Sequence, residues 1–193
     1  MPFSSSSSSP FQALQALAVI ETASIARGFV VLDAVVKKAP VSVKIARPVS
    51  PGRFLLVFGG DVASTLESIE EGRSVAGADV VDELFLPGVH HGLLPAIDRA
   101  IVAEAGEAIG VVETSTVSAA ILAADAALKS TDVALLRLHL ALGVGGKGWF
   151  TLAGPIGDVE AALEAVRSSA KPERLIGVEL IARPHLEVRG FLS

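Results

Sequence analysis

The chain has 193 residues, 51% of them hydrophobic and 19% charged, which is enough for two domains of roughly 90 residues and too apolar for global disorder. Its net charge is −5 and its aromatic content 5%, without a basic stripe, so the sequence argues against a nucleic-acid partner. It contains no cysteine, which excludes disulfides, thiol catalysis and sites in which cysteine holds zinc or an iron–sulfur cluster.

The first part of the chain predicts one small α+β unit. A serine run at residues 4–9 indicates that residues 1–13 are a flexible tail, and residues 14–92 alternate between strand and helix patterns. On the second helix, Val62, Leu66 and Ile69 share the face that we expect to be buried. The predicted elements are strand 14–21, a helix capped by Thr22 or Ser24 and ending near Lys38, strand 41–47, turn 48–52, strand 54–58 ended by Gly59-Gly60, helix 61–76 and strand 80–86.

The second part of the chain predicts the same order of elements. Residues 93–107 are predicted to be a linker with a short helix, and residues 108–186 to be a second unit with a glycine-rich turn between its middle strands. The predicted elements are strand 108–113, helix 116–129, strand 133–142, strand 149–153, helix 156–170 and strand 175–182, followed by a C-terminal tail over residues 187–193.

A repeat connects the two units. Glu-Thr at 21–22 returns at 113–114, and Asp33 with Lys37 returns as Asp125 with Lys129, all 92 positions later. At the end of the units, Pro184 aligns with Pro87 at an offset of 97, which places small insertions in loops. We therefore predict an α+β fold of two tandem ferredoxin-like β-α-β-β-α-β units, with antiparallel sheets that carry helices on one face.

The apolar content points to interfaces between subunits. Mean hydropathy is high at +0.58, yet charged residues interrupt every apolar stretch before it reaches membrane-spanning length. The N-terminus also lacks the basic and apolar regions of a secretory signal. We expect no membrane partner and attribute the apolar excess to contacts between subunits.

The glycine-rich segment 143–148 has the pattern G-x-G-x-x-G, but it does not predict a nucleotide site. A dinucleotide fingerprint needs a helix after it, whereas a strand is predicted on each side here. The pattern of a phosphate loop is also absent. Ala141 stands where its first glycine should be, and Gly148 stands where serine or threonine should follow Lys147. We interpret the segment as a hairpin turn whose backbone approaches another group closely.

Histidines and glutamates offer few catalytic or metal sites. His90 and His91 are adjacent, so their rings are expected to point apart in an extended loop, and no histidine spacing suits a metal. We therefore predict no metal and no cofactor. Glu21 and Glu113 could form an acid–base pair of an enzyme, but no nucleophile or base accompanies them. We prefer a structural role in which each accepts backbone amides near a helix start.

These features in combination resemble a bacterial microcompartment shell protein of the tandem-domain, trimer-forming class. The resemblance rests on the two Glu-Thr starts, the repeated Asp-x-x-x-Lys, the glycine-bearing hairpin and Arg183-Pro184-His185, and it covers residues 17–185. It implies a non-enzymatic homotrimer in the cytoplasm that forms a pseudohexameric tile of the shell. The implied partners are further copies of the chain, hexameric and pentameric shell proteins, encapsulated enzymes and small metabolites in a central pore.

The resemblance also implies roles for particular residues. Hairpin turns line the pore, and lysines with one arginine lie at the edge between tiles. The implied pore-lining residues are Ser50, Pro51, Gly52, Val144, Gly145 and Gly146, and the implied edge residues are Lys37, Lys129 and Arg183.

The sequence departs from the family pattern at several points. The first unit ends in Leu86-Pro87-Gly88 instead of Arg-Pro-His, so one edge arginine is missing. Some relatives hold an iron–sulfur cluster at the pore through cysteine, which this chain lacks. An alternative function is a small-molecule-binding regulatory module built from paired ferredoxin-like units.

Two cations flank the expected pore. Arg53 follows the first turn and Lys147 the second, at an offset of 94. In a trimer they would form a ring of six positive charges, so we expect the pore to favour small polar or anionic metabolites. The other interpretation is that both side chains pair with nearby carboxylates or turn to solvent.

Overall fold

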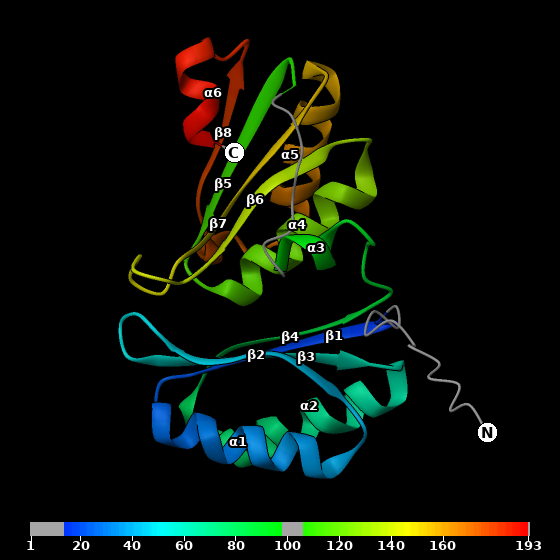
Figure 1. The fold of residues 1–193 in the computed structure, drawn as a ribbon, viewed down its shortest axis with the longest axis vertical. Helices are drawn as coiled ribbons and strands as arrows, with labels where there is room; N and C mark the ends of the chain where they lie inside the picture. Colours follow the sequence, from blue (N-terminus) through cyan, green and yellow to red (C-terminus); the bar gives the residue numbers. More distant parts are fainter. Residues whose placement is uncertain (1–13, 98–105, 193) are drawn as a thin grey trace, which may run out of the picture.

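The computed structural model describes residues 14–97 and 106–192, which form two units with the same order of elements (Figure 1). The first unit contains β1 (Ala16–Thr22), α1 (Ile25–Lys38), β2 (Ser42–Val49), β3 (Arg53–Gly60), α2 (Val62–Ala76) and β4 (Val80–Pro87), and the short helix α3 (Leu93–Ile97) follows it. The second unit contains β5 (Ala108–Thr114), α4 (Val117–Ser130), β6 (Ala134–Leu140), β7 (Gly148–Gly154), α5 (Ile156–Ser169) and β8 (Leu175–Ala182), and helix α6 (Leu186–Leu192) follows it.

Each unit has one four-stranded antiparallel sheet. The strand orders are β2-β3-β1-β4 and β6-β7-β5-β8, so the first strand of each unit lies between the third and the fourth. This is the ferredoxin-like topology, and the predicted fold class is confirmed. The matching registers also define counterparts: residues that occupy the same position in the two units.

Side chains that cap the helices fix where they begin. Ser24 accepts a hydrogen bond from the backbone N–H of Arg27, and Thr116 accepts one from that of Ala119. Asp61 accepts one from the backbone N–H of Ser64 at the start of α2. Each cap occupies one of the N–H groups that a helix leaves free at its N-terminus.

One face of the first sheet packs against α1 and α2. Its core contains Ile20, Phe54 and Phe58, together with valines from α1 and Ile69 from α2. The two helices pack closely because a Cβ at Gly72 would meet Ile20 at 2.5 Å and Val35 at 2.8 Å. The predicted buried face of α2 is therefore only partly correct: Ile69 is buried, but Val62 and Leu66 are exposed and small residues make the contact instead. The buried residues of α2 are Thr65, Ser68, Ile69, Gly72 and Ala76.

The opposite face of the first sheet packs against the second unit. Leu17, Val19, Leu55 and Val57 belong to one continuous core with α3 and α4. Figure 1 shows the sheet of the first unit between its own helices and those of the second unit. As a result α4 is buried on two sides, whereas α1 is buried on one; the buried residues of α1 are Gly28, Val31 and Val35. The two units thus form one packed body.

Two sequence predictions differ from the structure here. Gly59-Gly60 does not end β3, which runs on to Gly60; a Cβ at Gly59 would lie 2.3 Å from the carbonyl oxygen of Ala16, so the strand needs glycine for this close approach. Where a C-terminal tail was expected, Leu186–Leu192 form α6. The predicted N-terminal tail lies outside the described residues. No helix within the described ranges is long and apolar enough to cross a membrane.

Candidate functional site

The contact between the two units is centred on the buried carboxylate of Glu21. Its Oε1 accepts hydrogen bonds from the backbone N–H and the hydroxyl of Ser118, each at 2.8 Å, in the first turn of α4. Burial raises the pKa of Glu21, and the two bonds from Ser118 oppose this shift. Glu21 therefore has the structural role preferred from the sequence, although the helix that it caps belongs to the other unit. Because its side chain is fully buried, it is not available to a substrate.

Further polar contacts hold the two units together. The hydroxyl of Thr116 donates to Asp82 at 2.6 Å, and Asp82 also forms an ion pair with Arg174 at 3.4 Å. Arg47 donates to the carbonyl oxygen of Leu140 at 3.3 Å. The sequence repeat does not predict these contacts, because their residues do not repeat. By the registers of the neighbouring strands, the counterpart of Asp82 is Gly177 and that of Arg174 is Asp79.

The buried carboxyl group of Glu21 predicts the behaviour of two variants. We expect Glu21→Ala to lower the free energy of unfolding by about 2–4 kcal/mol, because Ser118 loses its acceptor inside the interface. Glu21→Gln keeps an acceptor oxygen for Ser118 and cannot ionise, so it should retain most of the stability that Glu21→Ala loses. Urea unfolding at several pH values measures both effects.

The raised pKa of Glu21 also predicts a pH dependence. The folded chain binds the proton more tightly than the unfolded chain, so the parent should gain stability relative to Glu21→Gln as the pH falls from the raised pKa toward the ordinary value of 4.5. If acidification through this window instead weakens the parent relative to Glu21→Gln, the buried carboxylate is stabilising as an anion and the account of its burial is wrong.

The turns expected at the pore lie together in the structure. Figure 1 shows the β2–β3 turn and the β6–β7 turn at the same side of the molecule. A Cβ at Gly146 would lie 3.0 Å from Nη1 of Arg53 and 3.2 Å from the carbonyl oxygen of Ser50. Gly143, Gly145 and Gly146 also have positive φ angles, which favour glycine. The expected close approach of this backbone to another group is confirmed.

The two cations beside these turns have different surroundings. Nζ of Lys147 lies 2.7 Å from Oε1 of Glu113, so a carboxylate of its own unit neutralises its charge. Nη1 of Arg53 is buried and has no hydrogen-bond acceptor among the described residues. The two members of the expected charge ring therefore differ in how they meet a carboxyl group: Lys147 forms an ion pair with Glu113, whereas Arg53 interacts electrostatically with the buried Glu21.

Both expected edge lysines are held by the aspartate four residues earlier. Nζ of Lys37 lies 2.6 Å from Oδ2 of Asp33, and Nζ of Lys129 lies 2.5 Å from Oδ2 of Asp125. The pairs differ in one respect. The carboxylate of Asp125 is buried and also accepts the backbone N–H of His90 at 2.8 Å, whereas that of Asp33 is exposed.

The registers correct the alignment of the unit ends. Ala16 pairs with Pro87 and its counterpart Ala108 pairs with Ala182, so the offset is 95, not 97. Arg183 therefore corresponds to Gly88, and both have positive φ angles of 50° and 69°. The first unit ends in Gly88-Val89-His90, which keeps the histidine that corresponds to His185 and lacks the arginine.

The histidine pair also differs from the prediction. The rings of His90 and His91 lie 4.4 Å apart in an edge-on arrangement, because the chain turns here to enter α3 and is not extended. Nδ1 of His90 accepts the backbone N–H of Gly92 in this turn. No group of three or more potential metal ligands occurs within residues 14–97 and 106–192.

Comparison with known proteins identifies relatives of both units. The BMC domain model matches residues 16–89 and 108–184. The shell protein PduT of Citrobacter freundii is 41% identical over 172 residues, which are 89% of this chain and 94% of that protein. The shell protein PduA of Salmonella typhimurium strain LT2 is 38% identical over 89 residues, which are 45% of this chain and 90% of that protein. The solved structure of a microcompartment protein from Desulfitobacterium hafniense DCB superposes with a TM-score of 0.83 at 34% identity, covering 92% of this chain and 99% of the other.

Proposed function

Since the chain belongs to the BMC-domain family and is a shell protein of bacterial microcompartments, we propose that three copies close into a pseudohexameric tile with a central pore. In this tile, six units surround the axis, and each places the sheet face opposite its own helices on the first helix of the next unit. This contact of a sheet with the first helix of the next unit forms once inside each chain and once between neighbouring chains. Such heterologous contacts close into a ring.

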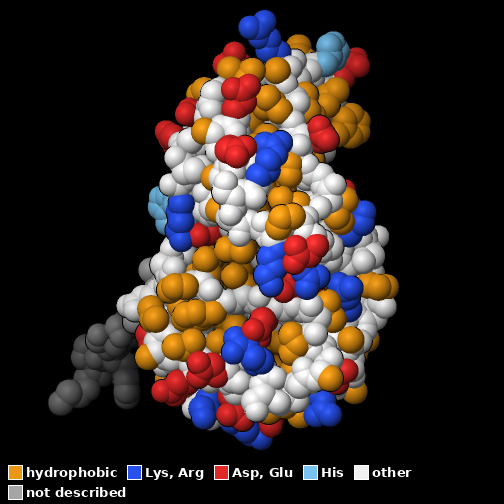
Figure 2. Space-filling view, turned by 180° about the vertical axis from the view of Figure 1, so that it is seen from behind, with side chains coloured by type: hydrophobic (Ala, Val, Ile, Leu, Met, Phe, Trp, Pro, Cys, Tyr) orange, Lys and Arg blue, Asp and Glu red, His pale blue; other side chains and the backbone are white. Residues whose placement is uncertain are grey.

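The observation that carries this proposal is the surface of α1. Phe29 and Val36 are 53% and 44% exposed, while their counterparts Ile121 and Leu128 in α4 are 0% and 7% exposed. The two apolar residues of α4 are buried at the contact between units, so α1 carries the same kind of surface without a cover. Figure 2 shows hydrophobic side chains reaching the surface of the first unit among acidic and basic ones. The partner that fits this surface is the second unit of another copy.

Glu113 supplies a second contact for the same interface. Its counterpart Glu21 accepts the backbone N–H of Ser118, and the counterpart of Ser118 is Ala26 at the start of α1. Glu113 would therefore accept the backbone N–H of Ala26 of the next chain. Ala26 has no hydroxyl to provide the second bond, and Lys147 stabilises this carboxylate instead.

The turns that lie together beside Arg53 would surround the axis of the tile. Ser50, Pro51 and Gly52 of one unit and Val144, Gly145 and Gly146 of the other would line the pore, which small polar metabolites would cross. The tile would bind neighbouring tiles through Lys37, Lys129 and Arg183, and these neighbours include other shell proteins. One of its faces would meet the encapsulated enzymes.

The geometry does not favour the other functions considered. Glu21 is buried against Ser118, and Glu113 forms an ion pair with Lys147, so neither is placed as a free acid or base. We propose that the protein has no catalytic activity. Its family also disfavours the regulatory module.

The pore makes a prediction about ions. Arg53→Ala combined with Lys147→Ala should lower the permeability of assembled shells to a small anion relative to a size-matched cation, by roughly severalfold at low salt. Permeability of shells to the two ions, before and after substitution, measures the effect. An unchanged anion preference in the double variant would show that Arg53 and Lys147 do not make the pore selective for anions.

Electron microscopy of the purified chain tests the tile itself. We expect top views with threefold symmetry in which six similar lobes surround a central opening. Particles with only twofold symmetry, or filaments that do not close, would contradict the proposed arrangement.

A further inference from the structure

Helices α3 and α6 are two copies of one element, although α6 was not expected from the sequence. The backbone N–H of Gly88 donates to the carbonyl oxygen of Gln15. In the same way, the backbone N–H of Arg183 donates to the carbonyl oxygen of Glu107, the counterpart of Gln15. After both turns the same pair of bonds forms to a histidine. Gly92 N–H donates to Nδ1 of His90 and Leu93 N–H to its carbonyl oxygen, while Glu187 N–H donates to Nδ1 of His185 and Val188 N–H to its carbonyl oxygen.

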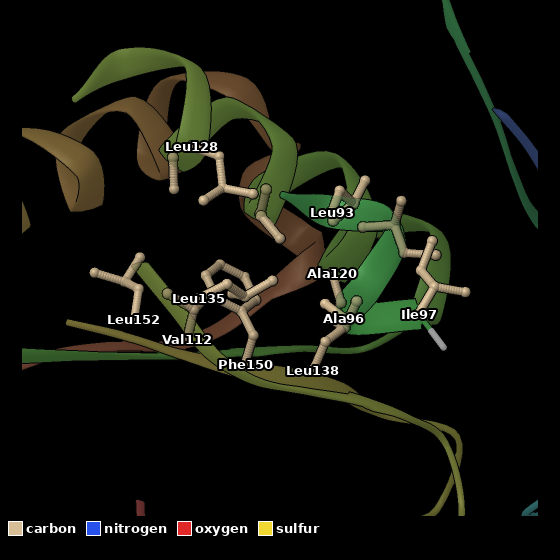
Figure 3. Close-up of a cluster of buried hydrophobic side chains, with 14 of the residues drawn as sticks. Leu93, Ala96, Ile97, Val112, Ala120, Leu128, Leu135, Leu138, Phe150 and Leu152 are labelled. Atoms are coloured by element: carbon tan, nitrogen blue, oxygen red, sulfur yellow. The ribbon is translucent and has the colours of Figure 1, made fainter. Parts of the chain in front are cut away.

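Helix α3 is packed on the second unit of its own chain. Leu93, Ala96 and Ile97 are buried against β6 and α4, as Figure 3 shows. The helix covers the open edge of the second sheet, where Leu135 and Leu138 of the edge strand β6 are buried beside it. In this position α3 makes part of the contact between units.

Among the described elements, helix α6 has no comparable packing partner. Leu186, Val188 and Phe191 are 77%, 40% and 82% exposed. The corresponding seat on the first unit, between α1 and β2, is also open. Val43 and Ala46 are exposed, although their counterparts Leu135 and Leu138 are buried under α3.

We propose that α6 docks on the first unit of a neighbouring copy, in the seat between its α1 and β2, and so locks each chain of the ring to the next. This inference rests on the proposed trimer. Val188 and Phe191 face the seat, because their counterparts Leu93 and Ala96 are buried in the equivalent one. The backbone N–H of His185 donates to Asp33 of the neighbour, as that of His90 donates to Asp125 within the chain. This bond gives the exposed Asp33 the same role as its buried counterpart.

Two single variants of α6 separate this docking from a general effect of a new charge. Phe191→Asp should raise the concentration at which the trimer dissociates by on the order of 100-fold. Leu186→Asp is the matched control: it is as exposed as Phe191 in the chain, but its counterpart His91 is exposed beside α3. Sedimentation over a range of concentrations measures both. Equal dissociation of the two variants overturns the proposal, and so does a Phe191→Asp trimer as tight as that of the parent.

Cross-linking tests the contact without relying on stability, because the chain has no cysteine of its own. A Cβ at Gly92 would lie 3.8 Å from Leu128, and the counterparts of these residues are Glu187 and Val36. With a short bis-maleimide, Val36→Cys combined with Glu187→Cys should give covalent dimers and trimers on a denaturing gel. Gly92→Cys combined with Leu128→Cys is the matched control and should cross-link only within the chain.

The outcomes separate the inference from the function that it rests on. Trimers that form without a Val36–Glu187 cross-link, while the control pair reacts, overturn the docking of α6 and leave the tile intact. A parent chain that sediments as a monomer overturns the tile.

Discussion

Replacing Phe29 by aspartate is expected to abolish trimerisation at micromolar concentration. Phe29 is 53% exposed on α1, and its counterpart Ile121 is fully buried where α4 meets the first sheet. Loss of a buried aromatic contact costs about 1.5–3 kcal/mol, and an unpaired carboxylate in the interface adds a further desolvation cost. Because the ring contains three such interfaces, the effect on assembly is large. Sedimentation or native mass spectrometry of the variant measures it.

Val62→Asp is the matched control for this variant. Val62 is 41% exposed on α2, and its counterpart Ile156 is also exposed, so neither lies where the units meet. The ring of Phe29 also lies 4.8 Å from that of Phe54, so a thermal unfolding curve is needed to show that the variant chain still folds. A folded Phe29→Asp chain that remains trimeric would show that α1 is not the surface between chains.

Replacing Lys37 and Lys129 together by alanine is expected to leave the trimer intact and prevent tiles from forming sheets. Each lysine is held in place by the aspartate four residues before it and is therefore ordered before it meets another tile. A charge-assisted hydrogen bond contributes about 1.5–3 kcal/mol, and the contact recurs at every edge of the lattice. Electron microscopy of concentrated protein shows whether sheets form.

Lys38→Ala combined with Lys171→Ala is the control, because it also removes two positive charges but leaves the repeated lysines at 37 and 129 in place. Lys38 forms an ion pair with Glu71 of its own unit at 3.5 Å. The control variant should form sheets as the parent does. Sheets of normal extent from the Lys37 and Lys129 variant would exclude the edge role of these lysines.

The repeat explains why the fold could be predicted from sequence. Glu-Thr at 21–22 and 113–114 ends the first strand in both units, and the caps Ser24, Thr116 and Asp61 begin helices where the sequence places them. Strand alternation and helix caps are local signals, so one chain is sufficient to recognise them. The topology then follows because two copies of one pattern favour one fold.

Contacts between the units could not be predicted in the same way. The carboxylate of Glu21 could be placed near a helix start, but the sequence does not show that the helix is α4 of the other unit. The offset of 95 at the unit ends depends on strand register, which shows that His185 corresponds to His90 and that α6 corresponds to α3. Periodicity gives the faces of an element but not the element that covers each face. The spacing therefore predicts a buried face that includes Val62, whereas Val62 is exposed.

The solution mass of the full chain tests the central claim most directly. Sedimentation equilibrium of the parent should give three times the chain mass of 19.8 kDa over a wide range of concentration and without added ligand. A trimer is expected because the surface of α1 and the open seat beside it need a second unit from another copy, and three chains of two units close the ring. A mass of one or two chains at every concentration would contradict the account.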